Sequence, residues 1–333
     1  MTRRVGICAA VLVASTLLAA ACSSSSSSHA SPVTGASTAP ASTTTTAGAT
    51  TSATATTACD RPHAPGRFAQ SFRFQGNTRT YQLYVPRKYT GTAKVPVVFD
   101  FHGFGSNAIE QMFYGNFMPE ADRDGFLIVA PDGQGAVGRH FVFTSEPGKQ
   151  NDVLMVGALL DHIEATFCVD AKRVYSTGMS DGGAMTAVLA CVASNRFAAF
   201  GAVAVIIYVP LCDRARPVPI MAFSGTADPV VPFNGGKVSC CGGSTLAAAP
   251  TAMANWAKHN MCSATFSDTR VGTEVTRRTW PACAPGSGGV FYIIEGGGHT
   301  WPGALPVPRL GKTTNQIDAS ATIWAFFKAH PLR

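Results

Sequence analysis

Short apolar runs rich in β-branched and aromatic residues alternate with runs of helical periodicity over most of this sequence. Buried parallel strands are apolar along their length, and each needs a crossover, usually a helix, to reach the next. The alternation therefore predicts an α/β fold with a mostly parallel sheet and helices on both faces. The predicted strands are 79–85, 95–101, 126–130, 173–177, 218–223 and 290–294, and the predicted helices are 152–165, 184–193, 247–260 and 318–329.

Residues 1–22 have the composition of an export signal. Two arginines precede an uncharged apolar run that is too short to be a membrane span. The end of this run resembles a bacterial lipobox and predicts a lipid on Cys22, although Ala19 stands where that pattern prefers leucine. A lipid of several acyl chains would hold the protein on the outer face of the cell membrane. The alternative is ordinary cleavage after small residues, which would release a secreted protein.

Residues 23–58 are nearly all Ser, Thr and Ala, without Lys, Arg, Asp, Glu, Phe, Tyr or Trp. Such a segment cannot bury a core, and we expect a disordered tether. A flexible chain of this length spans roughly 30–35 Å, which suits a link between a membrane and a folded domain. The remaining residues, 59–333, are within the range of one large domain.

The charge balance argues against a nucleic-acid partner. The formal charge of +7 includes Arg3 and Arg4, which leave with the signal, so the mature chain is nearer +5 (7 − 2). Its basic residues are scattered rather than clustered, which serves solubility and makes no binding surface for phosphates.

Eight cysteines follow Cys22, an even number in an exported chain, which predicts disulfides. No CxxC-like pair with nearby histidines is present, so the sequence predicts no metal site. Sequence cannot fix connectivity. The adjacent Cys240 and Cys241 form a vicinal bridge or pair elsewhere, and the pairs that we expect otherwise are Cys59–Cys168, Cys191–Cys212 and Cys262–Cys283.

The segment STGMSDGGA, residues 176–184, places Ser180 among Gly178, Gly182 and Gly183 at the junction of a predicted strand and helix. A serine on such a sharp turn is held in strained backbone geometry with its hydroxyl exposed above the sheet, where bulky neighbours would clash. This pattern predicts a nucleophile. The alternative is a glycine-rich turn whose serine merely caps the helix.

A serine nucleophile needs a base to take its proton and an acid to orient that base, in the chain order serine, acid, histidine for this kind of turn. After Ser180 the histidines are His259, His299 and His330. His299 follows a predicted strand on a glycine loop that we expect to be flexible enough to carry the imidazole over the sheet edge. His259 is predicted to lie at the surface of a helix, and His330 lies beside the C-terminus.

Asp228 is the predicted acid, because it lies just past a predicted strand, where loops gather at the carboxyl ends of a parallel sheet. Its alternative role is to form a turn before Pro229. The rival acids are Asp213, which precedes that strand, and Asp268, which lies in a polar stretch assigned to the surface.

The loop HGFG, residues 102–105, follows another predicted strand and offers backbone N–H groups for an oxyanion. We expect the two donors to be the N–H groups of Phe104 and of Asp181, the residue after the nucleophile. His102 is expected to support this loop rather than to transfer protons.

Four motifs together, HGFG, RVYSTGMSDGG, SGTADPVVP and GGGHTWPG, resemble the polyhydroxybutyrate depolymerase and feruloyl esterase group of α/β-hydrolases. With the lipobox and tether, the chain is similar to LpqC-type lipoprotein esterases. The resemblance covers residues 59–333 and implies an α/β-hydrolase fold with Ser180 as nucleophile, Asp228 as acid and His299 as base. The chain departs from the group at Ser224, where a histidine is usual.

The resemblance implies a serine esterase that needs no cofactor and acts through an acyl-enzyme on hydroxyalkanoate esters or on feruloyl or acetyl esters of polysaccharide. We expect Trp301 to line the substrate pocket, or else to belong to the core, and we expect a monomer. Two alternatives stay open, namely a serine peptidase and a non-catalytic surface-binding protein on a hydrolase scaffold.

Overall fold

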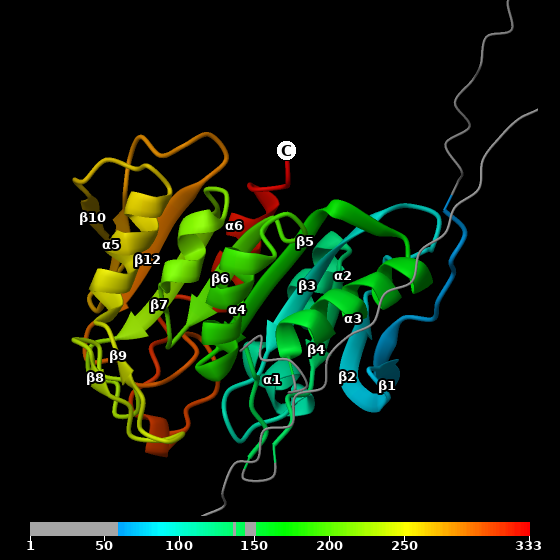
Figure 1. Cartoon of the computed structure of the whole chain (residues 1–333), viewed down its shortest axis with the longest axis horizontal. Coiled ribbons are helices and arrows are strands. Elements are labelled where there is room, and N and C mark those ends of the chain that lie inside the picture. The colour runs from blue at the N-terminus through cyan, green and yellow to red at the C-terminus, as the bar shows by residue number, and fades with distance from the viewer. Residues whose placement is uncertain (1–58, 136–137, 144–150) are drawn as a thin grey trace, which may run out of the picture. The chain divides into compact units, whose positions relative to one another are not determined.

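Ten strands form one continuous sheet in the computed structural model, which describes residues 59–135, 138–143 and 151–333 (Figure 1). They are β1 (Gly66–Phe74), β2 (Asn77–Val85), β3 (Val95–Phe101), β4 (Leu127–Pro131), β5 (Val169–Met179), β6 (Ala199–Val203), β7 (Pro219–Gly225), β10 (Ser267–Arg270), β11 (Val275–Thr279) and β12 (Gly288–Ile294). Across the sheet the order is β1-β2-β4-β3-β5-β6-β7-β12-β11-β10. The six central strands in this order, β4, β3, β5, β6, β7 and β12, are parallel. Two antiparallel strands extend the sheet on each side.

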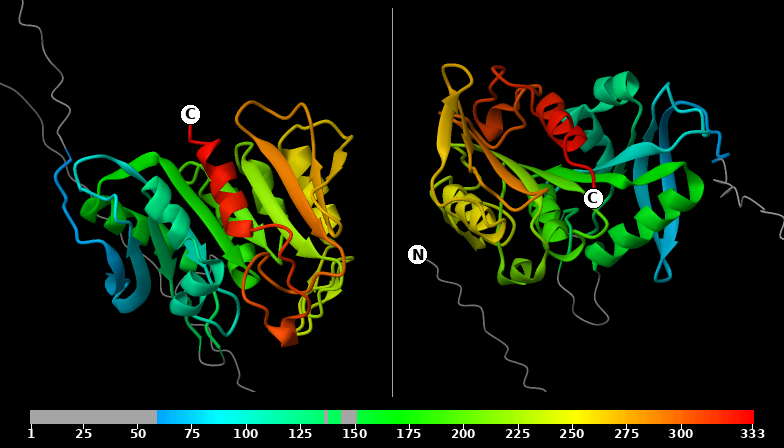
Figure 2. Two further views of the ribbon diagram at one scale, coloured as in Figure 1. Left: turned by 180° about the vertical axis from the view of Figure 1, so that it is seen from behind. Right: turned by 90° about the horizontal axis from the view of Figure 1, so that it is seen from above.

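Helices cover both faces of this sheet (Figure 2). One face packs against α3 (Asp152–Thr166), α4 (Asp181–Val192) and α5 (Ala249–His259), and the other against α1 (Ala108–Gly115), α2 (Met118–Asp124) and α6 (Ala319–Lys328). Outside these layers lie the short pair β8 (Gly236–Lys237) and β9 (Thr245–Leu246) and two 3₁₀ turns, Pro210–Arg214 and Pro308–Leu310. The predicted α/β architecture is therefore confirmed, and all described residues fall in one unit, Thr56–Arg333.

The predicted strands and helices are all present, with ends that differ by a few residues. β3 has the predicted bounds because its buried side chains are apolar almost throughout. β6 was not predicted, because its sequence AFGAV lacks the β-branched run of its neighbours. The small residues have a packing reason, since a Cβ atom at Gly201 would lie 3.0 Å from Ile323 of α6. Seven other elements were not predicted from the sequence, namely α1, α2, β1, β8, β9, β10 and β11.

The predicted pairs Cys59–Cys168, Cys191–Cys212 and Cys262–Cys283 are all formed. The pair left open, Cys240 and Cys241, forms a vicinal bridge. The predicted signal sequence, the lipid-modified Cys22 and the tether lie outside the described residues. Within the described ranges, no helix has the length and apolarity that a bilayer crossing requires.

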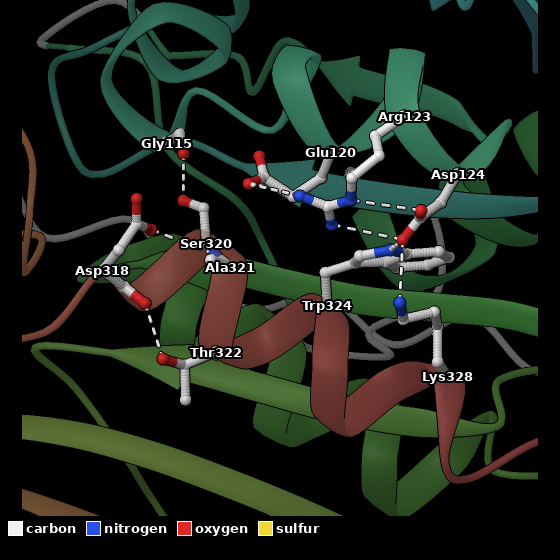
Figure 3. Close-up of polar contacts among 10 residues, drawn as sticks. All are labelled: Gly115, Glu120, Arg123, Asp124, Asp318, Ser320, Ala321, Thr322, Trp324 and Lys328. Carbon is white, nitrogen blue, oxygen red and sulfur yellow. Dashed lines mark hydrogen bonds and ion pairs between the residues drawn. The ribbon is translucent and has the colours of Figure 1, made fainter.

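Helix α6 is fixed to α2 by contacts that converge on Asp124 (Figure 3). The Asp124 carboxylate accepts hydrogen bonds from Arg123, Lys328 and the Trp324 indole, and these hold its pKa below its usual range, with Arg123 contributing most. At the other end of the helix, Asp318 caps α6 by accepting from Ala321 N at 3.0 Å. These contacts keep the first turn of α6 in place beside the cavity described below.

Candidate active site

Ser180 occupies a strained turn between β5 and α4. Its φ of 56° and ψ of −116° place it in a region that side-chain-bearing residues rarely adopt, and its N–H donates to Val203 O of β6 at 2.8 Å. The Ser180 side chain makes no capping hydrogen bond. The alternative of a serine that merely caps the helix is therefore wrong, and the strained turn has the geometry of a nucleophile elbow.

The glycines around Ser180 are required by close backbone packing. A Cβ atom at Gly182 would lie 2.0 Å from Phe101 O at the end of β3, and one at Gly178 would lie 2.6 Å from Gly182 O. A Cβ atom at Gly183 would lie 2.7 Å from Val205 O. Each neighbour is backbone, which cannot turn aside as a flexible side chain can.

We expect Gly182→Ala to lower the free energy of unfolding by about 3 kcal/mol, because the new methyl group forces β3 and α4 apart. Urea denaturation would measure the loss. Gly157→Ala is the matched control, since Gly157 is also helical but no atom lies within 4 Å of the added Cβ. That change should raise stability by roughly 0.5–1 kcal/mol. Equal effects of the two variants would contradict the packing argument.

Asp228 and His299 meet above the ends of two neighbouring parallel strands. Asp228 follows β7 and His299 follows β12, which are paired in the sheet. His299 Nδ1 lies 2.7 Å from Asp228 Oδ2, and their side chains are 5% and 2% exposed. Because Nδ1–H donates to the carboxylate, the other ring nitrogen, Nε2, keeps a lone pair that can accept a proton.

Asp228 combines the two roles that the sequence analysis offered as alternatives. While Oδ2 holds His299, Oδ1 accepts hydrogen bonds from the backbone N–H groups of Val230 and Val231, at 2.7 and 2.8 Å. The carboxylate therefore forms the turn and orients the imidazole at the same time.

The rival acids and histidines are engaged elsewhere. Asp213 accepts from the Tyr208 hydroxyl. Asp268, on the exposed strand β10, pairs with Arg278 of β11. The imidazoles of His259 and His330 each contact a backbone carbonyl, and neither lines the cavity that holds Ser180.

The glycine loop before His299 is tightly packed. The prediction that this loop is flexible is therefore wrong. A Cβ atom at Gly298 would lie 2.2 Å from Leu310 O, and one at Gly225 would lie 2.2 Å from Gly297 O. The N–H of His299 donates to Leu310 O at 2.6 Å. The glycines allow three backbone segments to meet, and this contact fixes the imidazole.

Ser180 and His299 line the same cavity, which has a volume of about 1000 Å³. Ser180 Oγ has no hydrogen-bond partner among the described residues, so a hydrogen bond to His299 Nε2 is not formed in this structure. Catalytic hydrogen bonds of this kind often tighten only when substrate binds. The structure thus brings the three predicted residues to one edge of the sheet.

The HGFG loop lies directly against Ser180. A Cβ atom at Gly103 would lie 3.3 Å from Ser180 Cβ. Within residues 59–135, 138–143 and 151–333, no acceptor is found for the backbone N–H of Phe104 or of Asp181. Two unengaged N–H groups beside a nucleophile fit the predicted oxyanion site.

His102 supports this loop and is fully buried. Its Nε2 accepts from Gly133 N at 2.9 Å and its Nδ1 lies 2.7 Å from Gly103 O, so Nδ1 carries the proton and donates. Burial lowers the pKa of His102 and keeps the ring neutral. Both ring nitrogens are occupied, as a supporting role requires.

The Asp181 side chain has a role that the sequence analysis did not predict. Its Oδ2 accepts from Phe141 N at 2.7 Å, which ties the start of α4 to residues 138–143. Burial raises the pKa of Asp181 to about 6, and the Phe141 hydrogen bond opposes this shift. A carboxylate beside two glycines carries no sequence signal for this half-buried position.

We expect Asp181→Asn to raise stability at pH about 8 by roughly 2 kcal/mol and to have little effect at pH about 4. Because the pKa of Asp181 is higher in the folded state, the native state binds more protons than the unfolded state between pH about 4 and about 6. The wild type therefore loses stability as pH rises through this range. The amide oxygen of the substituted side chain still accepts from Phe141 N, and the backbone N–H is unchanged. Melting temperatures at the two pH values would test this, and a gain that is the same at both would refute the pKa assignment.

Trp301 belongs mainly to the core, although it touches the cavity. It is 1% exposed, packs edge-on against Phe117 and donates from Nε1 to Ser320 Oγ at 2.9 Å. Ser320 in turn donates to Gly115 O at the end of α1 (Figure 3). Trp301 therefore connects the His299 loop to α1 through Ser320.

The comparisons with known proteins agree with this geometry. The family model for esterase PHB depolymerases matches residues 79–238. These matches support a place for the chain in the polyhydroxybutyrate depolymerase and feruloyl esterase group. It is 28% identical over 346 aligned positions to the putative esterase NocK of Nocardia uniformis subsp. tsuyamanensis, covering 97% of each chain.

Two feruloyl esterases are also similar to this chain. Feruloyl esterase B of Piromyces equi is 29% identical over 222 residues, which are 64% of this chain and only 41% of that enzyme. Probable feruloyl esterase C of Aspergillus oryzae is 27% identical over 76% of this chain and 85% of its own length. Acetyl xylan esterase from Aspergillus awamori shares the fold, with a TM-score of 0.56 and 15% identity over 78% of this chain and 99% of its own.

Ser224, where the family usually has a histidine, lies at the end of β7 just before the turn that carries Asp228. Its side chain is buried, and its hydroxyl has no partner among the described residues. The Asp228–His299 hydrogen bond is formed in spite of this departure.

Proposed function

We propose that this chain is a serine carboxylic ester hydrolase that works through an acyl-enzyme. The observation that carries the proposal is the buried Asp228–His299 pair, which faces the same cavity as the strained Ser180. A serine, a histidine and an aspartate so arranged can supply a nucleophile, a base and an orienting acid, and such an assembly serves acyl transfer.

In the proposed reaction, Ser180 Oγ attacks the ester carbonyl carbon while His299 Nε2 takes the hydroxyl proton. The N–H groups of Phe104 and Asp181 bind the oxyanion of the tetrahedral intermediate. His299 then returns the proton to the alcohol oxygen, the C–O bond breaks, and the acyl group remains on Ser180. Water repeats the sequence with His299 as base, which releases the acid and restores the serine. Asp228 stabilises the imidazolium form throughout.

The substrates that we propose are hydroxyalkanoate esters or feruloyl or acetyl esters of polysaccharide, which correspond to the names carried by the family and its relatives. Export is supported by the four disulfides, which persist in oxidising compartments. We propose in addition that Cys22 is lipidated and that residues 23–58 tether a monomeric catalytic domain to the outer face of the membrane.

Two measurements on the full mature chain test the esterase. Purified protein should hydrolyse at least one ester in a panel of short aliphatic, hydroxybutyrate-oligomer and feruloyl esters. A fluorophosphonate probe should label the native protein, with the modification mapped to the peptide that contains Ser180. A native protein that neither hydrolyses an ester nor takes the probe would support the surface-binding alternative, and turnover of peptides alone would support a peptidase.

A further inference from the structure

Helix α1 presents apolar side chains to the cavity beside the nucleophile. Ile109 and Phe113, one helical turn apart, are 48% and 55% exposed, and Phe104 of the oxyanion loop is 37% exposed. The three side chains form what we call the α1 wall.

The α1 wall is held in place by polar contacts on its inner side. Asp132 Oδ1 accepts from Ala108 N at 2.9 Å, and Asn107 caps the helix by accepting from Glu110 N at 3.0 Å. Gln111 donates to the buried Asp100 at 2.8 Å. The exposed apolar side chains therefore stand on a fixed support.

A second apolar wall follows His299 along the chain. It consists of Ala304, Leu305, Pro306 and Val307, and we call it the 304–307 wall. Leu305 is 83% exposed. The segment is preformed, since Ala304 N donates to Trp301 O at 3.0 Å and the N–H of the preceding Gly303 donates to Thr314 O at 2.8 Å.

Single exposed apolar side chains are ordinary, but a cluster around a nucleophile indicates a ligand surface. The acidic side chains of the cavity are occupied within the fold, because Glu110 accepts from Ser106 Oγ at 2.7 Å and Asp318 caps α6. The Arg67 guanidinium lies 4.6 Å from the centre of the Phe113 ring, which holds the ring at the mouth of the cavity.

The positions of the base and of the oxyanion donors divide the substrate between the two walls. The leaving alcohol oxygen receives its proton from His299, so the alcohol half must lie on the His299 side. The 304–307 wall lies on this side, because it lines the same cavity and Ala304 N donates to Trp301 O of the His299 loop. The carbonyl oxygen faces the N–H of Phe104. The acyl half therefore lies on the other side of the cavity, which the α1 wall forms.

We propose that the substrate is an ester with extended apolar groups on both sides of its carbonyl, the acyl group on the α1 wall and the alcohol group on the 304–307 wall. This inference rests on the proposed ester hydrolysis and deepens it. It assigns Phe113 and Leu305 to specificity for opposite halves of the substrate. It also narrows the substrates proposed above: an acetyl group would leave the α1 wall uncovered and a sugar alcohol would meet an apolar surface, so acetyl and polysaccharide esters are excluded.

The test measures kcat/KM on two ester series. The first varies the acyl group from acetyl through butyryl to octanoyl with a fixed alcohol, and the second varies the alcohol from methyl through butyl to octyl with a fixed butyryl group. Hydrolysis is followed by titration of the released acid. Phe113→Ala should lower the octanoyl-to-acetyl ratio about tenfold or more and change the octyl-to-methyl ratio far less. Leu305→Ala should show the reverse pattern.

Phe266→Ala is the matched control. Phe266 is 48% exposed and lies under the Arg278 guanidinium at 3.6 Å, as Phe113 lies under Arg67, but it is absent from the cavity. It should leave both ratios unchanged.

Wild-type hydrolysis in either series establishes the esterase, whatever the variants do. If the two variants lower both ratios equally, exchange their effects or alter neither ratio, the assignment of the walls is wrong while the esterase stands. If the wild type hydrolyses no ester of either series but cleaves other esters, only the inferred substrate class is wrong. If it hydrolyses none at all, both proposals fail.

Discussion

Ser180→Ala should lower kcat for ester hydrolysis by about 10⁴-fold or more, because the acyl-enzyme cannot form without the hydroxyl. The substitution should hardly affect folding, since the Ser180 side chain makes no capping hydrogen bond and Oγ has no partner among the described residues. Loss of activity with an unchanged melting temperature therefore reports the nucleophile itself. Initial rates on the best ester of the panel and a thermal melt would measure both quantities.

The same variant should lose labelling by the fluorophosphonate probe. Ser106→Ala is a useful comparison, because Ser106 lines the same cavity but donates to Glu110 instead of being free. Its hydrolysis rate should stay within about tenfold of the wild type, since it removes one neutral-to-charged hydrogen bond and no reacting group. Turnover by Ser180→Ala close to the wild-type rate would exclude the elbow serine as the nucleophile.

Asp228→Asn should lower kcat by about 10⁴-fold while the fold stays intact. The amide oxygen of the variant can still accept from Val230 N and Val231 N, so the turn is preserved. The amide N–H₂ then faces His299 Nδ1 and favours the tautomer whose Nε2 carries the proton, which cannot act as a base. Steady-state kinetics should show the loss in kcat with a smaller change in KM.

Three further variants separate catalysis from structure at this position. Asp228→Ala should lose stability as well as activity, because the turn loses both of its hydrogen bonds. Asp213→Asn and Asp268→Asn change the rival acids, which contact Tyr208 and Arg278 instead of His299. Both should keep kcat near the wild-type value, and a loss in either one comparable to that of Asp228→Asn would point to a different acid.

The sequence predicts the centre of this fold better than its edges. Buried parallel strands such as β3 are nearly continuous apolar runs, and that signal is local. β6 has no such run, because Gly201 must admit the side chain of Ile323 from α6, and the need for a small residue arises only from tertiary packing. The strands β10 and β11 are rich in polar residues, and β10 is exposed throughout, so their sequences resemble those of loops.

The candidate catalytic residues could be predicted from motif order, but not their contacts. That Asp228 and His299 touch follows from the pairing of β7 with β12, which are distant in sequence. The Trp301–Ser320–Gly115 connection depends on where α6 packs, and the sequence of α6 shows only an amphipathic helix. Likewise, the helical pattern of α1 is too short to have been predicted, so the α1 wall was missed.

Ser320 connects the His299 loop with helix α1 from behind the cavity, through buried hydrogen bonds to Trp301 and Gly115. The chemistry and the selectivity of such an enzyme can then be altered separately. Substitutions at positions 109, 113 and 305 could admit bulkier or more polar esters. The buried hydrogen bonds of Ser320 would meanwhile keep the His299 loop in place. Among relatives of this chain, the side chains at these three exposed positions should vary widely, whereas the residue at position 320 should vary little.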